Sequence, residues 1–284
     1  MAFTGVLPAE KLTPAPYGLF TAADVTEHGS RDEHWIGGFS AESEACAFNA
    51  TLIDICGDVD PVTVRDTLDD QRWIDVEPFG IVAMDHCLTP GLSVIDRRAR
   101  ILRQLDLITP KAVETELWQG LFRREADGAE TGMYLASTAA TTITATAQKV
   151  RVGLGLLEQN LANCSSGFQG VIHITPLVAA LLGTELDQDG DTLLTKSGNK
   201  VSVGTGYDGR GPGDDASPAA AAVQHWMYAT GPVFVHLGTD ELVTVNDAQS
   251  VDVETNIATW VAEKPAIAYW DGCCHFAVKV DVTL

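Results

Sequence analysis

The chain has 284 residues, and 18 Lys and Arg against 39 Asp and Glu give a formal net charge of −21 at pH 7. So negative a protein repels nucleic acid and anionic membranes at long range, which excludes a general DNA-binding protein. Hydrophobic residues make up 45% of the chain and charged residues 20%, as in ordinary globular proteins, so wholesale disorder is excluded as well. The length allows one large domain or two modest ones.

The first residues contain no basic stretch followed by an apolar run, so we expect no secretory signal. Apolar runs such as 176–183 are far too short to span a bilayer, and we expect no membrane partner. Six cysteines in a chain of this length do not form a disulfide scaffold. They indicate a reducing compartment in which most cysteines are buried as small hydrophobic residues, although Cys46 and Cys56 are near enough in the sequence to pair.

The first third of the chain lacks long periodic segments. Residues 1–45 have scattered apolar positions interrupted by proline and glycine, which predicts an extended arm that lies across something else. In residues 46–92, short apolar runs alternate with turn residues. We predict strands at 51–55 and 80–84 on either side of an acidic segment, as in a long hairpin or extended loop.

Helical signals begin at Ser93, which is predicted to cap a helix. Thr109 and Pro110 have the form of an N-cap followed by a first-turn proline, so we predict that a second helix starts there. A further amphipathic helix is predicted after the Thr- and Ala-rich stretch 133–147. Apolar residues at helical spacing mark these last two helices: Val113, Leu117 and Leu121, and then Val150, Leu154, Leu157 and Leu161.

The second half of the chain is mostly β. Residues 171–174 form an apolar strand, and Thr175 followed by proline predicts a short helix after it. Turn residues at 197–200 predict a hairpin, and alternating apolar residues at 233–237 predict a half-buried strand. Asp-Gly at 271–272 lies between two alternating runs and predicts a second hairpin. The fold class is therefore α+β.

Two loops resemble ligand-binding motifs. Residues 204–209 match the glycine spacing of a dinucleotide-binding turn, but that turn must open a helix, and Arg-Gly-Pro-Gly follows here. We expect a flexible loop at this position. Residues 187–191 resemble the start of a calcium loop, yet their glycine is the fourth residue rather than the sixth, so we expect a solvated turn.

No catalytic, cofactor-binding or metal-binding residue is predicted. Cys273, Cys274 and His275 are adjacent on a predicted strand and point to alternate faces, which favours buried packing over a shared metal ion. The sequence contains no GxSxG, HExxH or P-loop motif. A cluster of arginines on the first predicted helix is either a solvated face balanced by acidic neighbours or a cationic patch for an acidic partner or nucleic acid: Arg97, Arg98, Arg100 and Arg103, with Asp96 and Asp106.

The order of these elements resembles the major capsid protein of tailed bacteriophages, which has the Hong Kong 97-type fold. Residues 171–182 and 193–204 look like the strand, short helix and hairpin of that family's axial domain. Residues 226–236 and 254–279 are similar to its late and closing strands. The phrases at 15–20 and 34–39 resemble capsid proteins of actinobacterial phages.

The resemblance implies an α+β Hong Kong 97-like capsid fold, in which 109–123 is the spine helix or its second half. The break at Thr109 and Pro110 would interrupt a long spine helix. The implied parts are an N-terminal arm (1–45), an extended loop (46–92), a peripheral domain with the spine helix (93–150), an axial domain (151–245) and closing strands that return to the peripheral domain (246–284).

The function implied by this resemblance is structural, without catalysis or cofactors. Copies of the chain would form the hexamers and pentamers of an icosahedral phage head around double-stranded DNA, assembled in the bacterial host cytoplasm and ending in the virion. Implied partners are scaffolding, portal and decoration proteins, with weak contacts to packaged DNA. Three alternatives stay open: a nanocompartment shell of the same fold, another virion part such as a tail tube or decoration protein, and a nucleotide-dependent enzyme that uses 204–209.

Overall fold

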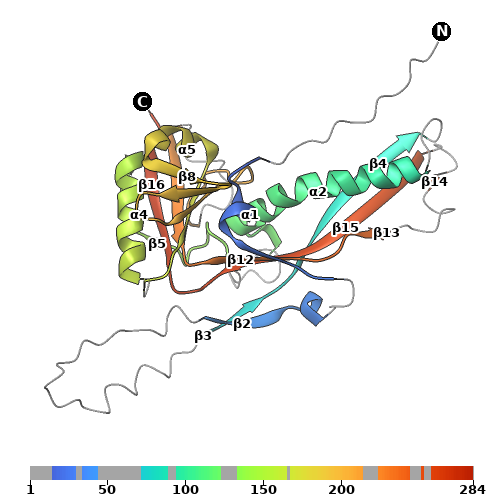
Figure 1. Cartoon of the computed structure of the whole chain (residues 1–284), viewed down its shortest axis with the longest axis horizontal. Coiled ribbons are helices and arrows are strands. Elements are labelled where there is room, and N and C mark those ends of the chain that lie inside the picture. The colour runs from blue at the N-terminus through green and yellow to red at the C-terminus, as the bar shows by residue number, and fades with distance from the viewer. Residues whose placement is uncertain are drawn as a thin grey trace, which may run out of the picture.

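Two sheets and one long helix organise the chain (Figure 1). A six-stranded sheet runs along the molecule beside the helix α2, and an eight-stranded sheet lies at one end under the helices α4 and α5. A separate two-stranded sheet lies below the long body in that view. The computed structural model describes residues 15–29, 34–43, 72–88, 94–122, 133–164, 167–213, 223–243, 251–252 and 257–283.

The long strand β15 (Ile257–Trp270) is the axis of the six-stranded sheet. It pairs antiparallel with β4 (Phe79–Leu88) along the whole of β4. The strands β12 (Val233–Leu237), β13 (Glu241–Val243) and β14 (Val251–Asp252) also pair with β15, and β1 (Asp24–Glu27) adds parallel to β12. The predicted alternation at 233–237 is confirmed, because β12 alternates buried and half-buried residues.

The spine of the molecule is a single helix, α2 (Val94–Gln119), with Pro110 inside it. The predicted break at Thr109 and Pro110 was therefore wrong. Thr109 does not act as an N-cap: its hydroxyl donates to the Leu105 carbonyl, 2.7 Å away, and its side chain is buried. Packing of the apolar stripe against β4 and β15 outweighs the cost of an internal proline.

The eight-stranded sheet forms the other end of the molecule. Its strand order is β5-β16-β11-β7-β10-β9-β8, with β6 also beside β16. The strands are β5 (Thr141–Thr142), β6 (Gln148–Lys149), β7 (Val171–Ile174), β8 (Leu186–Asp189), β9 (Thr192–Thr195), β10 (Lys200–Val203), β11 (Gln224–Thr230) and β16 (His275–Asp281).

Two helices pack on this sheet as the sequence predicts. The helix α4 (Val150–Cys164) buries all four apolar residues of its predicted stripe. The helix α5 (Pro176–Leu182) starts at Thr175, whose hydroxyl accepts from the Val178 amide, and a 3₁₀ turn, η2 (Gly183–Glu185), follows it. The hairpin at 197–200 is confirmed between β9 and β10.

The turn at Asp271 and Gly272 does not form the predicted hairpin. It joins β15 to β16, but β15 belongs to the six-stranded sheet and β16 to the eight-stranded one. Of the segments near the C-terminus, β16 therefore lies in the eight-stranded sheet, whereas β14 and β15 lie with β12 in the six-stranded sheet beside α2. The Asp-Gly pair correctly predicted that the chain turns at this point. It could not predict which strands pair with β15 and β16, because those partners come from distant segments of the chain.

The described part of the N-terminal arm lies on the chain's own body. The short helix α1 (Leu19–Ala22) buries Leu19, and the Val203 amide donates to the Tyr17 carbonyl. After a 3₁₀ turn, η1 (His34–Gly37), β2 (Phe39–Ser43) pairs antiparallel with β3 (Arg72–Val76). The predicted strand at 80–84 lies within β4 and pairs with β15, while the predicted strand at 51–55 lies outside the described residues.

The cysteines also differ from the prediction. Cys164, at the end of α4, and Cys274, just before β16, form a disulfide with a Cα–Cα distance of 5.9 Å. Cys273 is disulfide-bonded as well. A separation of 110 residues gives no sequence signal for the pair. The fold brings the two side chains together beneath α4, so Cys274 is buried as predicted but is not a free thiol.

Candidate functional site: interaction surfaces and the junction that holds them

A buried glutamate joins the spine helix to two other parts of the chain. Glu114, on α2, is only 2% exposed. Its Oε1 accepts a hydrogen bond from the Leu19 amide of the arm at 3.0 Å. Its Oε2 accepts from the Gly206 amide at 3.0 Å and from the Thr205 hydroxyl at 3.1 Å. One carboxylate therefore fixes the arm and the 204–209 loop to the same turn of the helix.

This arrangement explains the glycine pattern at 204–209. A Cβ on Gly206 would lie 2.5 Å from the Lys111 carbonyl oxygen, so the loop needs glycine in order to approach α2. The Gly206 amide, a donor that a phosphate would need, binds Glu114 instead. The expectation of a flexible loop was wrong, because Gly204, Gly206 and Tyr207 are buried.

Behind the loop lies a buried polar cluster. The Nδ1 atom of His173 lies 3.1 Å from the Tyr207 hydroxyl oxygen, and its Nε2 atom lies 3.0 Å from the Thr230 hydroxyl oxygen. The hydroxyl groups of Ser202 and Tyr207 form a hydrogen bond of 2.8 Å. Burial lowers the pKa of His173 to about 3, and a nearby His275 lowers it further in the same direction. These groups have no access to solvent or substrate, so the cluster positions Tyr207, whose ring packs on Trp118 of α2.

The residues that the sequence singled out do not gather into a reactive centre. His275 donates to the Leu135 carbonyl, and burial lowers its pKa to about 4. The acidic stretch 187–191 forms the exposed hairpin between β8 and β9, as predicted. Within the described residues, no group of three or more His, Cys, Asp or Glu could hold a metal ion, and no helix is long and apolar enough to cross a membrane.

The arginines of α2 are spread over the exposed side of the helix. Arg98, Arg100 and Arg103 are exposed, and Arg100 lies 3.7 Å from the largely buried Asp85 of β4. Asp106 pairs with Lys264 of β15 at 3.2 Å rather than with an arginine. The side chain of Arg97 lies outside the described residues. The acid beside Arg100 is therefore Asp85, which the sequence had not offered as a partner, while Arg98 and Arg103 are exposed to solvent.

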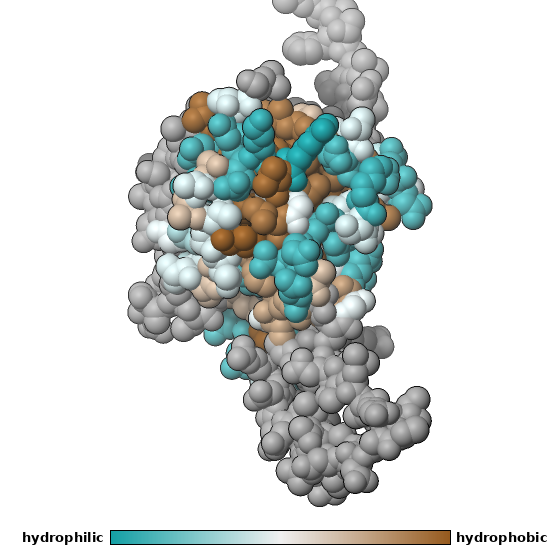
Figure 2. Space-filling view, turned by 90° about the vertical axis from the view of Figure 1, so that its left-hand side faces the viewer, coloured by the Kyte–Doolittle hydropathy of each residue, from teal (hydrophilic) through white to brown (hydrophobic). Residues whose placement is uncertain are grey.

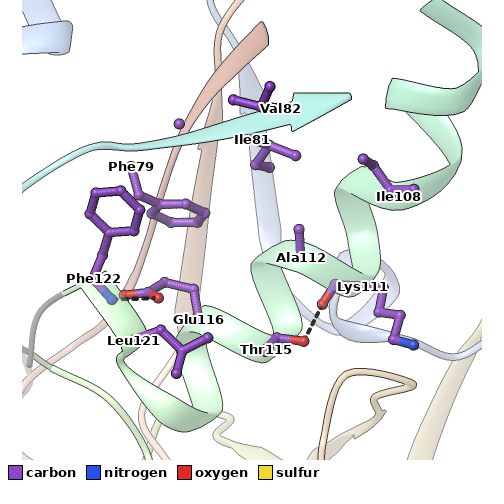
Figure 3. Close-up of a pocket in the computed structure, with 11 residues that line it drawn as sticks. Phe79, Ile81, Val82, Ile108, Lys111, Ala112, Thr115, Glu116, Leu121 and Phe122 are labelled. Carbon is purple, nitrogen blue, oxygen red and sulfur yellow. Dashed lines mark hydrogen bonds between the residues drawn. The ribbon is translucent and has the colours of Figure 1, made fainter. Parts of the chain in front are cut away.

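A groove opens between the C-terminal half of α2 and the start of β4 (Figure 3). Its volume is about 400 Å³. Phe79 and Ile81 come from β4, and Ile108 and Ala112 from α2, while Leu121 and Phe122 follow the end of that helix. Phe122 is 62% exposed, so a large apolar side chain borders an open cavity. Polar groups line only part of it, namely Lys111, Thr115 and Glu116.

A second apolar surface lies on α4 and α5, at the end of the molecule that holds the eight-stranded sheet (Figure 1). Figure 2 shows a band of hydrophobic residues on this face between hydrophilic borders. Val152 of α4 is 49% exposed and Leu177 of α5 is 45% exposed, and the half-buried Leu156 and Leu181 lie on the same two helices. Exposed apolar patches of this kind on a soluble protein mark contact surfaces.

The two-stranded sheet of β2 and β3 carries a third apolar feature, Trp73. Along β3, Ile74 and Val76 face the cluster around Tyr269 and Ile267 of β15. Trp73 and Asp75 alternate with them and face away, and Trp73 is 61% exposed. The alternation in β3 was readable from the sequence and is the signal that could have identified Trp73. Glu114 and the groove had no such local signal, because their partners lie far away in the chain.

Comparison with known proteins agrees with this architecture. The chain is similar to the capsid of Ralstonia phage GP4, with 8% identity, a TM-score of 0.53, and coverage of 100% of this chain and 96% of that one. It is similar to the SrpI encapsulin of Synechococcus elongatus PCC 7942, with 12% identity, a TM-score of 0.52, and coverage of 100% and 94%. It is also similar to a chain from Gordonia phage Cozz, with 13% identity, a TM-score of 0.51, and coverage of 97% and 91%.

The chain has the Hong Kong 97-type shell fold. The resemblance seen in the sequence is thereby confirmed at the level of the fold. The division of the chain into an arm, an extended loop, a peripheral domain and an axial domain stays a prediction. Under that prediction α2 is the spine helix beside the sheet of the peripheral domain, and α4, α5 and most of the eight-stranded sheet belong to the axial domain. No family model and no curated protein matches the sequence itself.

Proposed function

We propose that the chain is a structural subunit that assembles with copies of itself into a closed shell, as the major capsid protein of a phage head. The observation that carries this proposal is the match over the full length to both a phage capsid and an encapsulin. The match also covers nearly all of each neighbour, so the shared fold extends over the whole of both shell subunits.

The surfaces of the chain support self-association. The groove beside α2, the band on α4 and α5, and Trp73 on β3 are apolar and lie on different parts of the molecule. Contacts between unlike surfaces of identical copies close into rings when the rotation allows it. Rings of five subunits would be the pentamers of the proposed shell, and rings of six would be its hexamers.

We also propose that the chain is not an enzyme. The loop at 204–209 was the best candidate for a nucleotide site, and its Gly206 amide is bound to Glu114. The net charge of −21 suits a container that must not hold its DNA tightly, while Arg98 and Arg103 offer weak local contacts. Scaffolding, portal and decoration proteins, and assembly in the host cytoplasm, belong to the same proposal.

A nanocompartment shell is the second candidate, because an encapsulin shares the fold over the full length. The two functions differ in their contents. Particles from phage-infected cells should protect double-stranded DNA from nuclease, whereas nanocompartments should contain a co-purifying protein. We favour the phage head because the sequence phrases at 15–20 and 34–39 resemble phage capsid proteins.

The test is the assembly state of the purified full chain. Static light scattering and negative-stain electron microscopy are applied with and without polyethylene glycol as a crowding agent. We expect closed polyhedral particles or rings of five and six subunits. A chain that stays monomeric or dimeric under all conditions and gains thermal stability from NAD or ATP would contradict the proposal and support the enzyme alternative.

A further inference from the structure

Trp73 stands apart from the other tryptophans of the chain. The sequence has six, and the other five are at most 9% exposed: Trp35, Trp118, Trp226, Trp260 and Trp270. Trp73 is 61% exposed on the face of β3 that points away from the body. An indole left in water does not gain the stabilisation that burial of a large apolar side chain gives. Exposed tryptophans are also the residues most enriched among the strongest contributors to protein interfaces.

The groove beside α2 is the complementary feature. Its volume of about 400 Å³ lies within the range of about 300–1,000 Å³ that is typical of sites for small organic groups. Figure 3 shows the rings of Phe79 and Phe122 close together at one end of the groove, with Ile81 and Ala112 along it. Aromatic rings on two sides favour an aromatic occupant, since offset or edge-to-face pairs add stability beyond buried area.

We propose that Trp73 of one copy inserts into the groove between α2 and β4 of a neighbouring copy. This inference rests on the proposed function, because it names the partner and the residues of one shell contact. Trp73 does not line the groove of its own chain. The contact therefore joins unlike surfaces of two copies, as ring closure requires.

The polar wall of the groove fits the indole as well. The Oε2 of Glu116 accepts a hydrogen bond from the Phe122 amide at 3.1 Å. A carboxylate offers about four acceptor positions, so Glu116 is able to accept the indole N–H in addition. The ring of Trp73 from the neighbouring copy would thus pack among Phe79, Leu121 and Phe122. Its indole N–H would donate a hydrogen bond to the Glu116 carboxylate.

The experiment measures, in one assay, the protein concentration at which each full-length variant begins to assemble. Trp73→Ala is expected to raise the protein concentration needed for assembly about tenfold, which is typical of the loss of an interface anchor. Trp73→Phe should recover most of this loss, because it keeps a ring. Glu42→Ala is the matched control, since Glu42 lies opposite Trp73 in the β2–β3 ladder and offers no apolar group. Circular dichroism establishes that each variant is folded.

A second arm tests the groove directly. Ala112→Phe should fill the cavity from within and raise the assembly concentration by a similar factor, and combining it with Trp73→Ala should add no further loss. A photo-crosslinking amino acid at position 73 should link neighbouring subunits through the two segments that line the groove, 79–82 and 108–122. Assembly of Trp73→Ala at the wild-type concentration, or crosslinks elsewhere, would overturn the inference and leave the shell function intact. Failure of the wild-type chain to assemble would instead refute the proposed function.

Discussion

At the scale of single residues, Glu114 decides how the spine helix meets the rest of the chain. It accepts three hydrogen bonds from two distant segments, and no lysine or arginine is among these partners. Sequence reasoning identified Val113 and Leu117 as a buried stripe but had no means of placing the acid between them. Its role depends on the Leu19 and Gly206 amides, which lie far away in the sequence.

Replacing this carboxylate should destabilise the fold. In Glu114→Gln, an NH₂ group takes the place of one acceptor oxygen and leaves a buried backbone donor unpaired. We expect the free energy of unfolding to fall by about 1–3 kcal/mol in urea titrations. Glu77→Gln is the control, because Glu77 is exposed and should change stability by less than about 0.5 kcal/mol. Equal stability of the two variants would show that Glu114 does not hold the junction.

The buried histidines predict a loss of stability in acid. Burial lowers the pKa of His173 to about 3 and that of His275 to about 4, both below the ordinary value of 6.5. Between those values and 6.5 the unfolded chain binds protons that the folded chain does not, so stability falls as the pH decreases from 6.5. Each histidine should remove roughly 2 kcal/mol between pH 7 and pH 5.

The measurement is the free energy of unfolding of the unassembled chain at pH 7 and pH 5. The variant His173→Gln should show a smaller decrease between the two pH values than the wild-type chain does. Protonation also relieves the repulsion of a charge of −21, but this effect is common to both proteins. A decrease of the same size in both would contradict the assignment to His173.

At the scale of elements, the sequence predicted where individual helices and hairpins form better than it predicted which distant segments they pack against. The stripe of α4, the Thr175 cap of α5 and the β9–β10 hairpin depend on neighbouring residues and were confirmed. The break at Pro110 and the hairpin at 271–272 were wrong, because long-range packing decides both. Pro110 stays inside α2 where the helix is anchored along β4 and β15, and Gly272 turns the chain from one sheet into the other.

The disulfide between Cys164 and Cys274 should stabilise the packing of α4 on the eight-stranded sheet. It closes a loop with a sequence separation of 110, for which the chain-entropy estimate is about 4–5 kcal/mol. We expect Cys164→Ala combined with Cys274→Ala to lower the melting temperature markedly relative to wild type without reductant. Dithiothreitol should lower the melting temperature of the wild type more than that of the double variant. Peptide mapping that finds no 164–274 link in the non-reduced chain would contradict this pairing.

At the scale of the whole molecule, the order of the elements carried more information than any motif. An arm, an extended loop, a spine helix and a β-rich end predicted the Hong Kong 97-type fold, although identity to solved neighbours is only 8–13%. The surfaces were not predictable in the same way. The groove and the band on α4 and α5 exist only where distant segments pack together, and both leave apolar groups exposed on a single copy.

The most direct test of self-assembly is cryo-electron microscopy of the particles formed by the full-length chain. We predict a closed shell in which the axial domains of five or six copies surround each symmetry axis. Each peripheral domain, with its spine helix, should contact the next subunit in the ring. Particles that lack closed rings, or a chain that forms only discrete monomers or dimers at high concentration, would contradict the account.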